Sequence, residues 1–412
     1  MNDLALESPA QFAHAHRLVN LPRLRQVLAA EGVAAIVATS PENVTYASGY
    51  WALSQWIRRG PQTYVLLPAE DPENACLVFA SSLLDLLADQ PVWVTDVRRF
   101  GYFRFDRAEG RLDPLSARQV ALDDLPVEDD ALSALVAAIR ARGLASARIA
   151  VDELGLMPGQ WEALQALLPD AHLVPAMRLF RGIRAVKTPE EIARLRQAAQ
   201  ITERSIAAAL DIARPGITEI EMARAFHAQT VAEDGTPVLG CIGFGVRSAM
   251  PNVQPSDTPL AEGDIIRFDA GGRYRHYRAD IARIATLGQA PERVRRYHHA
   301  LHRGVDAALE AIRPGVRASR IFEIAVETVR REGIPHYERS HVGHGIGLDG
   351  YDLPDLTAAS QDVIEEGMVM CVETPYYELG WGGLQVEDTV VVRAHGIETF
   401  MTTSGALVEI GT

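Results

Sequence analysis

The last third of the 412-residue chain contains five side chains of the types that bind divalent cations. They are Asp269, Asp280, His344, Glu373 and Glu387. Four carboxylates and one imidazole are enough to hold two cations, with carboxylates bridging them and a water activated between them. This donor set suits Mn²⁺, Co²⁺, Fe²⁺ or Zn²⁺. We therefore expect a site for two divalent metal ions.

The strands expected around the first two ligands suggest how they meet. Residues 264–269 are predicted to form a strand that ends at Asp269, and the Ala-Gly-Gly sequence at 270–272 is predicted to turn the chain. Asp280 follows eleven positions after Asp269. A hairpin would bring these two carboxylates face to face.

The other three ligands lie in glycine-rich or apolar segments. His344 is in residues 341–347, where alternating glycines permit close backbone approach and leave the imidazole facing a cavity. Glu373 ends an apolar run and Glu387 begins another, so both are expected on strands. One acidic residue in such a position is ordinary at a turn or a solvated edge. Several together indicate a site, because burying carboxylates is costly unless positive charge balances them.

These segments resemble the pita-bread metallopeptidases, the family of methionine aminopeptidase, aminopeptidase P, prolidase and creatinase. All five ligand positions match in type, order and spacing, within residues 268–272, 280–283, 343–347, 373–375 and 386–389. Residues 40–49 are similar to a segment of the creatinase/prolidase amino-terminal domain. The resemblance implies an α/β amino-terminal domain over residues 1–180 and an α+β pita-bread catalytic domain over residues 181–412.

The resemblance also implies roles and partners. The family's residue at the position of Glu373 is both a metal ligand and the general acid/base, so Glu373 would pass a proton to the leaving nitrogen. Two divalent cations are implied, with manganese foremost, and so is a homodimer. Relatives use the region after residue 49 to cap the partner subunit's active site, and here that region contains Trp51, Trp56, Arg58 and Arg59.

Four positions depart from the family's pattern. Asn252 and Tyr351 stand where its peptidases carry histidines that touch the substrate, Gln385 where prolidases often have arginine, and Ala282 where a threonine is common. Asn252 and Tyr351 can donate hydrogen bonds to an oxyanion, but neither carries positive charge. Either the substrate has changed while the metal chemistry is kept, or the chain is an ordinary peptidase that tolerates other residues at these positions. We expect Asn252, Tyr351 and Gln385 to contact the substrate.

Two further histidines lie near the ligands in the sequence. His341 is next to the glycine-rich segment and is a candidate to line the substrate cleft. His276 lies between the two aspartates in a segment rich in arginine and tyrosine, and we expect it at the surface.

Three functions are compatible with these residues. The leading hypothesis is a dinuclear metal-dependent hydrolase that cleaves an amide C–N bond in a small peptide-like substrate, as an Xaa-Pro dipeptidase or Xaa-Pro aminopeptidase. The second is a hydrolase or lyase of a small metabolite, like the creatinase, ectoine hydrolase and dimethylsulfoniopropionate lyase of this superfamily, and Asn252 and Tyr351 motivate it. A catalytically inactive binding module is disfavoured, because the chain retains all five ligands.

Bulk properties are those of an ordinary globular protein. The formal net charge of −14 argues against a nucleic-acid partner, since binding to phosphates rewards clustered Lys and Arg. Three cysteines with apolar neighbours exclude a disulfide framework and are expected to be buried thiols. The first residues lack a signal-peptide pattern, and no apolar run reaches membrane-spanning length. We expect a cytoplasmic protein with no membrane partner.

Alternating helical and apolar patterns over residues 21–177 predict the α/β domain. Strands are expected at 34–38, 64–67, 76–79 and 149–151, helices at 24–30 and 130–142, and a loop at 98–111. A boundary is expected near Arg181. A helix follows, with a hydroxyl cap at Thr188, proline at its first position and Glu191 three residues after the cap.

A weak internal repeat connects residues 207–216 with residues 306–315, at an offset of 99 positions. Each copy ends a helix with Pro-Gly and is followed by another helical pattern. Either common capping chemistry or a duplicated half-domain would explain this. The pita-bread fold has such pseudo-symmetry, with its metals between the halves.

Overall fold

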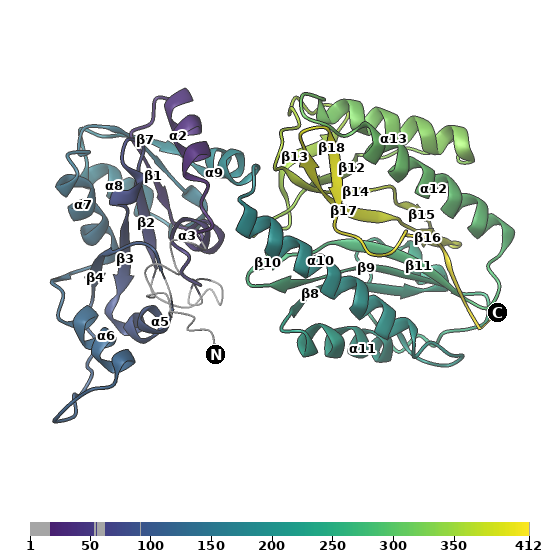
Figure 1. The fold of residues 1–412 in the computed structure, drawn as a ribbon, viewed down its shortest axis with the longest axis horizontal. Coiled ribbons are helices and arrows are strands. Elements are labelled where there is room, and N and C mark those ends of the chain that lie inside the picture. The colour runs from purple at the N-terminus through teal and green to yellow at the C-terminus, as the bar shows by residue number, and fades with distance from the viewer. Residues whose placement is uncertain (1–16, 53–54, 56–61, 91, 412) are drawn as a thin grey trace, which may run out of the picture. The chain divides into compact units, whose positions relative to one another are not determined.

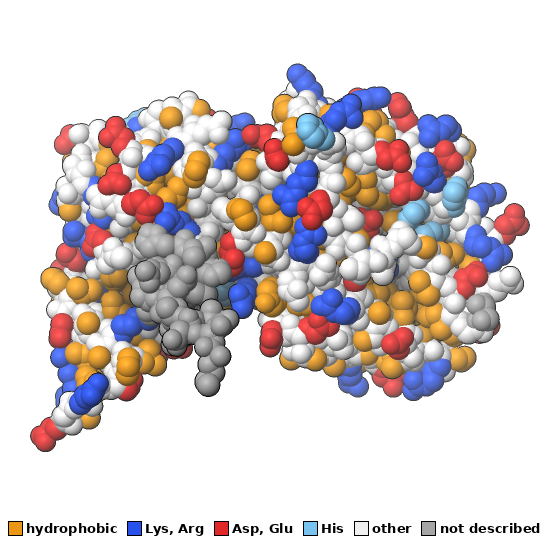
Figure 2. Space-filling view, in the orientation of Figure 1, with side chains coloured by type: hydrophobic (Ala, Val, Ile, Leu, Met, Phe, Trp, Pro, Cys, Tyr) orange, Lys and Arg blue, Asp and Glu red, His pale blue; other side chains and the backbone are white. Residues whose placement is uncertain are grey.

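The computed structural model describes residues 17–52, 55, 62–90 and 92–411, which form two compact units with their boundary in the sequence between Arg184 and Ala185 (Figure 1). On the face shown in Figure 2, acidic and basic side chains are interspersed. Within the described ranges, no helix is both long enough and apolar enough to cross a bilayer.

The amino-terminal unit is a seven-stranded sheet with flanking helices, in the order β5-β4-β3-β2-β1-β6-β7. Its strands are β1 Ala35–Ala38, β2 Tyr64–Pro68, β3 Cys76–Ala80, β4 Asp96–Phe100, β5 Val127–Glu128, β6 Arg148–Val151 and β7 His172–Pro175. Its α-helices are α2 Leu21–Ala30, α3 Pro41–Ser48, α5 Leu84–Asp89, α6 Pro114–Asp123, α7 Ala131–Ala141, α8 Gln160–Leu167 and α9 Met177–Arg184. The short 3-10 helices are η1 Pro72–Asn74, η2 Ser81–Leu83 and η3 Glu153–Gly155. Strand β2 is antiparallel to β1 and β3, and the other pairs are parallel.

The predicted strands and helices of this unit are confirmed, with small shifts at their ends. The loop expected at 98–111 is wrong at its start, because residues 98–100 belong to β4 and pair in parallel with β3. Trp51 is half-buried, and its N–H donates to Gln90 Oε1 at 2.7 Å. Trp56, Arg58 and Arg59 lie outside the described residues.

The segment that resembles the family's amino-terminal domain, residues 40–49, is held by one buried carboxylate. Asp152 Oδ2 accepts hydrogen bonds from the N–H of Ser40 at 2.9 Å and from Asn43 Nδ2 at 2.7 Å. Asn43 Oδ1 in turn accepts from the buried guanidinium of Arg184. A buried carboxylate requires such donors, so these polar residues fix the start of α3.

The second unit is built on a ten-stranded sheet, along which β10-β9-β11-β17-β14-β12-β13 form a path; β8 pairs with β9, β18 with β17 and β19 with β11. Its first strands are β8 Thr236–Phe244, β9 Ile265–Tyr274, β10 Tyr277–Arg278, β11 Ile281–Leu287, β12 His341–Gly345 and β13 Asp352–Thr357. Its later strands are β14 Val369–Glu373, β15 Tyr376–Glu378, β16 Gly382–Leu384, β17 Glu387–Arg393, β18 Gly396–Thr399 and β19 Val408–Ile410, and β15 pairs only with β16. Its helices are α10 Pro189–Leu210, α11 Glu219–Ala232, η4 Gly245–Ala249, α12 Glu292–Ala311 and α13 Ala318–Glu332.

Helices cover this sheet in two pairs (Figure 1). α10 packs on β9 and α11 on β8, whereas α12 packs on β14 and α13 on β13. The capping box predicted at Thr188 is confirmed, since Thr188 Oγ1 accepts from the N–H of Glu191 and Glu191 Oε2 accepts from the N–H of Thr188. This α+β arrangement agrees with the expected fold class.

The two copies of the internal repeat, residues 207–216 and 306–315, also make corresponding long-range hydrogen bonds. The N–H of Gly216 donates to Leu260 O at 2.8 Å, and the N–H of Gly315 donates to Ile364 O at 2.9 Å. Each turn then forms an isolated antiparallel bridge, at Thr218 in the first copy and at 317 in the second. Only the first copy has a capping box. Capping chemistry alone does not explain matched long-range partners, so these contacts favour a duplicated half-domain.

The turn expected directly after Asp269 is wrong. Strand β9 continues through Asp269 to Tyr274, and β11 pairs alongside it. Gly271 and Gly272 serve close packing here, because a Cβ on Gly271 would lie 1.7 Å from the carbonyl oxygen of Ala279. Glycine within a strand can mark such a close backbone approach as well as a turn.

Candidate metal centre

Neighbouring strands place three of the five predicted ligands in one row. Asp269 lies opposite Ala282, Ala282 opposite Glu387, and Glu387 opposite Glu373 in the antiparallel registers. Residues directly opposite each other project from the same face of a sheet. Asp269, Glu387 and Glu373 therefore share a face of the sheet.

The remaining two ligands are in phase with this row. Asp280 precedes Ala282 by two positions, and His344 lies opposite Cys371, which precedes Glu373 by two positions. Because side chains alternate along a strand, a spacing of two returns to the same face. Asp280 and His344 therefore join the row of carboxylates.

Asp280, His344 and Glu387 converge most closely, and each has a potential ligand atom within 4.8 Å of the others. His344 Nε2 is 3.9 Å from Asp280 Oδ2, and its Nδ1 is 3.0 Å from the carbonyl oxygen of Gly345. A proton on Nδ1 leaves the lone pair of Nε2 facing the carboxylates. Asp280 Oδ1 is buried and has no hydrogen-bond partner among the described residues. An orphaned carboxylate oxygen beside an imidazole lone pair fits a divalent cation.

Asp269 and Glu373 are linked to this trio through Gln385. The Gln385 amide is buried and donates to Glu373 Oε2 at 3.1 Å and to Glu387 Oε2 at 3.4 Å. Its Oε1 accepts from Arg267 Nη1 at 2.9 Å, and the same nitrogen lies 3.2 Å from Asp269 Oδ2. Gln385, which is expected to contact the substrate, thus also orients the carboxylates of Glu373 and Glu387.

Arg267 is completely buried, and all of its N–H groups are used. Beyond Asp269 and Gln385, it donates from Nε to Ser248 O at 2.8 Å and from Nη2 to Met250 O and Pro251 O at 2.6 and 2.9 Å. A guanidinium has five donors, and here five acceptors surround it. Arg267 therefore supplies a fixed positive charge next to the carboxylates and anchors residues 248–251, at the end of η4.

Electrostatics of the metal-free fold oppose full ionisation of the carboxylates. Burial raises the pKa of Asp269 to about 6, with Arg267 opposing this and Glu373 adding repulsion. Burial, followed by the charge of neighbouring carboxylates, raises the pKa values of Asp280 and Glu387 well above their ordinary range. Bound cations would remove this penalty.

Glu373 differs from the other carboxylates because donors surround it. His341 Nε2 is 3.0 Å from Glu373 Oε1. Burial acts to raise the pKa of Glu373, but the hydrogen bond and charge of His341, followed by His344, hold that pKa below its ordinary value. His341, predicted to line the cleft, thus contacts the predicted acid/base directly.

The two altered positions have different surroundings. Tyr351 is 60% exposed, and its ring centroid lies 4.1 Å from that of His344. Burial of part of the ring and the nearby carboxylates raise the pKa of Tyr351 to about 12, so the phenol is neutral. Asn252 is exposed and directly follows Pro251, whose carbonyl Arg267 holds. Tyr351 therefore lies at the cluster, whereas Asn252 is tied to it only through the backbone of Pro251.

The expectation that His276 lies at the surface is wrong, since it is half-buried and burial lowers its pKa to about 3. Sequence reasoning also missed Arg267 and Arg283. Arg283 Nη1 donates to Glu387 O at 2.8 Å and supports that ligand from behind. An arginine two positions before Asp269 in an apolar strand was a usable signal, since it must share a face with that carboxylate.

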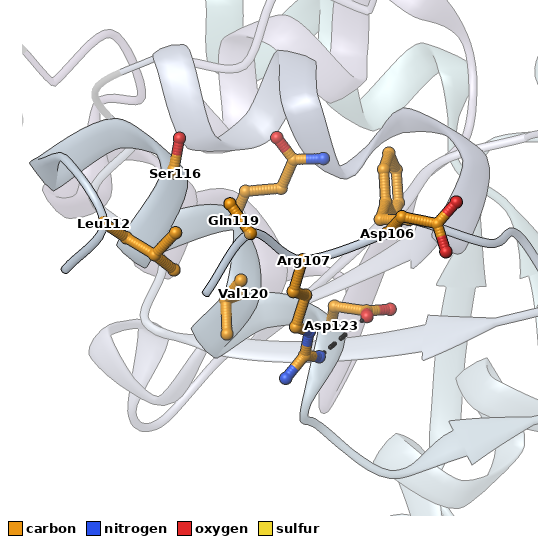
Figure 3. Close-up of a pocket in the computed structure, with 9 residues that line it drawn as sticks. Asp106, Arg107, Leu112, Ser116, Gln119, Val120 and Asp123 are labelled. Carbon is orange, nitrogen blue, oxygen red and sulfur yellow. Dashed lines mark hydrogen bonds and ion pairs between the residues drawn. The ribbon is translucent and has the colours of Figure 1, made fainter. Parts of the chain in front are cut away.

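A cavity of about 280 Å³ lies in the amino-terminal unit, beside α6 (Figure 3). Arg107 at its edge pairs with Asp123 at 3.0 Å and with Asp124 at 2.8 Å, and Asp106 accepts from Arg104. Its charged groups are thus paired with one another, and we assign it no role.

Comparison with known proteins agrees with this architecture. A model of metallopeptidase family M24 matches residues 193–394, and a model of the creatinase/prolidase N-terminal domain matches residues 21–186. The chain is 30% identical over 231 residues to the Xaa-Pro dipeptidase of Pyrococcus furiosus, a match that spans 56% of this chain and 66% of that protein.

Solved structures have the same two-domain fold. Dipeptidase PepE from Mycobacterium ulcerans is 25% identical, with a TM-score of 0.76 over 97% of this chain and 98% of that one. The Xaa-Pro dipeptidase from Bacillus anthracis is 21% identical, with a TM-score of 0.76 over 97% and 100% of the two chains. The family models together cover most of the sequence, and a metallopeptidase family implies a divalent metal cofactor. The chain therefore belongs to metallopeptidase family M24 and is a hydrolase that joins a creatinase/prolidase-type amino-terminal domain to a pita-bread catalytic domain.

Proposed function

We propose that this protein is a dinuclear metal-dependent hydrolase that cleaves the amide C–N bond of an Xaa-Pro dipeptide or of an amino-terminal Xaa-Pro bond. The observation that carries the proposal is the common face of the five potential ligands, of which Asp280, His344 and Glu387 converge, with Asp280 Oδ1 buried and without a hydrogen-bond partner among the described residues. The names of the similar dipeptidases support the choice of substrate. In this proposal residues 181–412 carry out catalysis.

Asp269, Asp280, His344, Glu373 and Glu387 would hold the two cations. We propose manganese first, because oxygen donors dominate the set, with cobalt, zinc or iron as alternatives. When bound, the cations supply Lewis acidity to the scissile carbonyl and acidify a water for attack near neutral pH.

Proton transfer is assigned to Glu373. Its two oxygens receive hydrogen bonds from His341 Nε2 and from Gln385 Nε2, so the carboxylate is oriented and stays ionised. It accepts the proton that the attacking water releases and delivers it to the leaving nitrogen as the C–N bond breaks. Tyr351, Asn252, His341 and Gln385 are proposed to contact the substrate.

A second candidate function is hydrolysis or elimination on a small non-peptide metabolite. The packing of the neutral phenol of Tyr351 against His344 supports it, because this position then offers a hydrogen bond without positive charge. A substrate that lacks a charged peptide end would suit such a site.

Reconstitution distinguishes these functions. Metal-free protein is loaded separately with Mn²⁺, Co²⁺, Zn²⁺ or Fe²⁺ and assayed against Xaa-Pro dipeptides, longer Xaa-Pro peptides, creatine and cyclic amides. The proposal expects metal-dependent cleavage of proline peptides that Asp280→Asn abolishes and the surface change Asp306→Asn leaves intact. Turnover of creatine or a cyclic amide alone would favour the second candidate, and undiminished activity of Asp280→Asn would refute both.

We also propose a homodimer, on the family resemblance of the amino-terminal domain. Sedimentation equilibrium at assay concentration tests this directly. A fully active monomer would refute it.

A further inference from the structure

Arg339 lies close to the candidate metal centre and pairs with no carboxylate among the described residues. It lies between α13 and β12, two positions before His341, and is half-buried. Its Nε is buried and has no hydrogen-bond partner, and no carboxylate pairs with it among the residues that the structure describes. Its guanidinium lies over the ring of Tyr377, whose centroid is 5.6 Å from Arg339 Cζ.

That contact places Arg339 beside the catalytic carboxylates. Tyr377 Oη donates to Gln385 Oε1 at 3.0 Å, and Gln385 Nε2 donates to Glu373 at 3.1 Å. The charge of Arg339 is also close enough to assist His341 and His344 in opposing the effect of burial on the pKa of Glu373. A guanidinium that pairs with no carboxylate of the described residues thus lies one aromatic ring away from the ligand network.

Tyr337 supplies a second unused donor nearby. Its side chain is 1% exposed, and its hydroxyl is buried without a hydrogen-bond partner among the described residues. Its backbone is fixed, because Arg330 Nε donates to Tyr337 O at 2.7 Å and the N–H of Tyr337 donates to Ile334 O at 2.9 Å. Burial raises the pKa of this phenol, with Arg339 and Glu373 both close enough to affect it, so the hydroxyl keeps its proton.

Arg267, another arginine near the carboxylates of the site, differs from Arg339 in having all of its donors occupied. Its five N–H groups are already bound to five acceptors, so it cannot receive a substrate group. Buried donors left unpaired are costly, and native proteins usually satisfy them. Arg339 Nε and the Tyr337 hydroxyl, which have no acceptor among the described residues, therefore indicate an acceptor that arrives from outside.

We propose that Arg339, assisted by Tyr337, receives a carboxylate of the substrate next to Glu373. The planar guanidinium fork matches a carboxylate, and its charge offsets the repulsion that an anionic substrate meets at four acidic side chains. This inference rests on the proposed function and deepens it. In an Xaa-Pro dipeptide the free carboxylate is adjacent to the scissile bond, so the chain would act as a dipeptidase in preference to an aminopeptidase on longer peptides.

The test compares a free acid with its amide. The manganese-loaded protein is assayed on alanyl-proline and alanyl-prolinamide, and calorimetry measures binding of L-proline and L-prolinamide to the same protein. We expect Arg339→Met to lower the acid-to-amide ratio of kcat/KM by about 10- to 100-fold. Arg339→Lys should recover part of that ratio, Tyr337→Phe should lower it by less, and the exposed change Arg320→Met should leave it unaltered.

Each outcome is decisive. Equal preference for acid and amide in both measurements on the wild type overturns the carboxylate receptor, while cleavage of both keeps the proposed function. A loss that is equal for acid and amide in Arg339→Met also overturns it, because it indicates a structural or oxyanion role. If the wild type cleaves neither peptide, the proposed function fails, and calorimetry decides: a preference for proline that Arg339→Met removes supports the receptor, and no preference overturns it.

Discussion

In the metal-free protein the free energy of unfolding should decrease as pH rises. Carboxylates that are paired with cations usually give the opposite dependence. In the metal-free fold the pKa of Asp269 is raised from 3.8 to about 6, by burial first, with Arg267 opposing and Glu373 adding repulsion. Between these two values the folded state holds a proton that the unfolded chain has released. Stability therefore falls as pH rises through this range.

The size of the effect follows from the two pKa values. For Asp269 alone the full loss is about 3 kcal/mol above pH 6, and about half of it falls between pH 5 and pH 7.5. For a domain of this size, that half corresponds to a decrease in Tm of about 3–6 °C. Asp280 and Glu387, whose pKa values are raised well above the ordinary range, add to the loss in the same direction.

Thermal unfolding of chelated and manganese-loaded protein at pH 5.0 and pH 7.5 measures this. The metal should raise Tm more at pH 7.5, where protons no longer compete for the same oxygens. Asp280→Asn removes one repelling charge without changing shape, so in chelated protein it should raise Tm more at pH 7.5 than at pH 5.0. Chelated protein that is as stable at pH 7.5 as at pH 5.0, with an equal gain from manganese at both, would show that the carboxylates do not repel one another as inferred.

Three further predictions concern single contacts. Glu373→Gln should lower kcat by about 10²–10⁴-fold; steady-state kinetics that retain half of the activity would remove Glu373 from proton transfer. Gln385→Leu should cost about 1–3 kcal/mol of unfolding free energy in the metal-free protein, because Glu373 Oε2 loses its donor and one N–H of Arg267 Nη1 loses its acceptor; an unchanged denaturation midpoint would contradict this. Asn252→His with Tyr351→His should shift kcat/KM toward Xaa-Pro dipeptides by on the order of 1–3 kcal/mol per donor; strong wild-type turnover that the double change leaves unaltered would mean that these departures carry no functional information.

Local signals in the sequence were sufficient for many elements. The cap at Thr188 and the apolar strands of the amino-terminal domain depend on neighbouring residues, and the structure confirms them. The common face of Asp269, Glu373 and Glu387 follows from strand periodicity once the registers are known. Their metals and their roles stay predictions.

Long-range contacts were beyond the sequence. The glycines after Asp269 predict a turn from local sequence alone, because the close approach of the Ala279 carbonyl depends on how the backbone between β10 and β11 packs against β9. The saturation of Arg267 depends on three carbonyls of residues 248–251. The hydrogen bonds of Gln385 to Arg267 and Glu373 likewise join segments far apart in the sequence, and its contact with the substrate stays a prediction.

The register between β11 and β17 has a mechanical consequence. One residue pair, Ala282 with Glu387, joins these strands, whereas six pairs join β9 to β11 and five join β14 to β17. The sheet therefore has a narrow seam, with Asp269 and Asp280 on one side and the other three ligands on the far side. Cations bound across this seam would hold the two parts of the sheet together. Without them, β11 and β17 should separate before either part of the sheet unfolds. Amide hydrogen exchange would then accelerate first at residues 281–283 and 387–389.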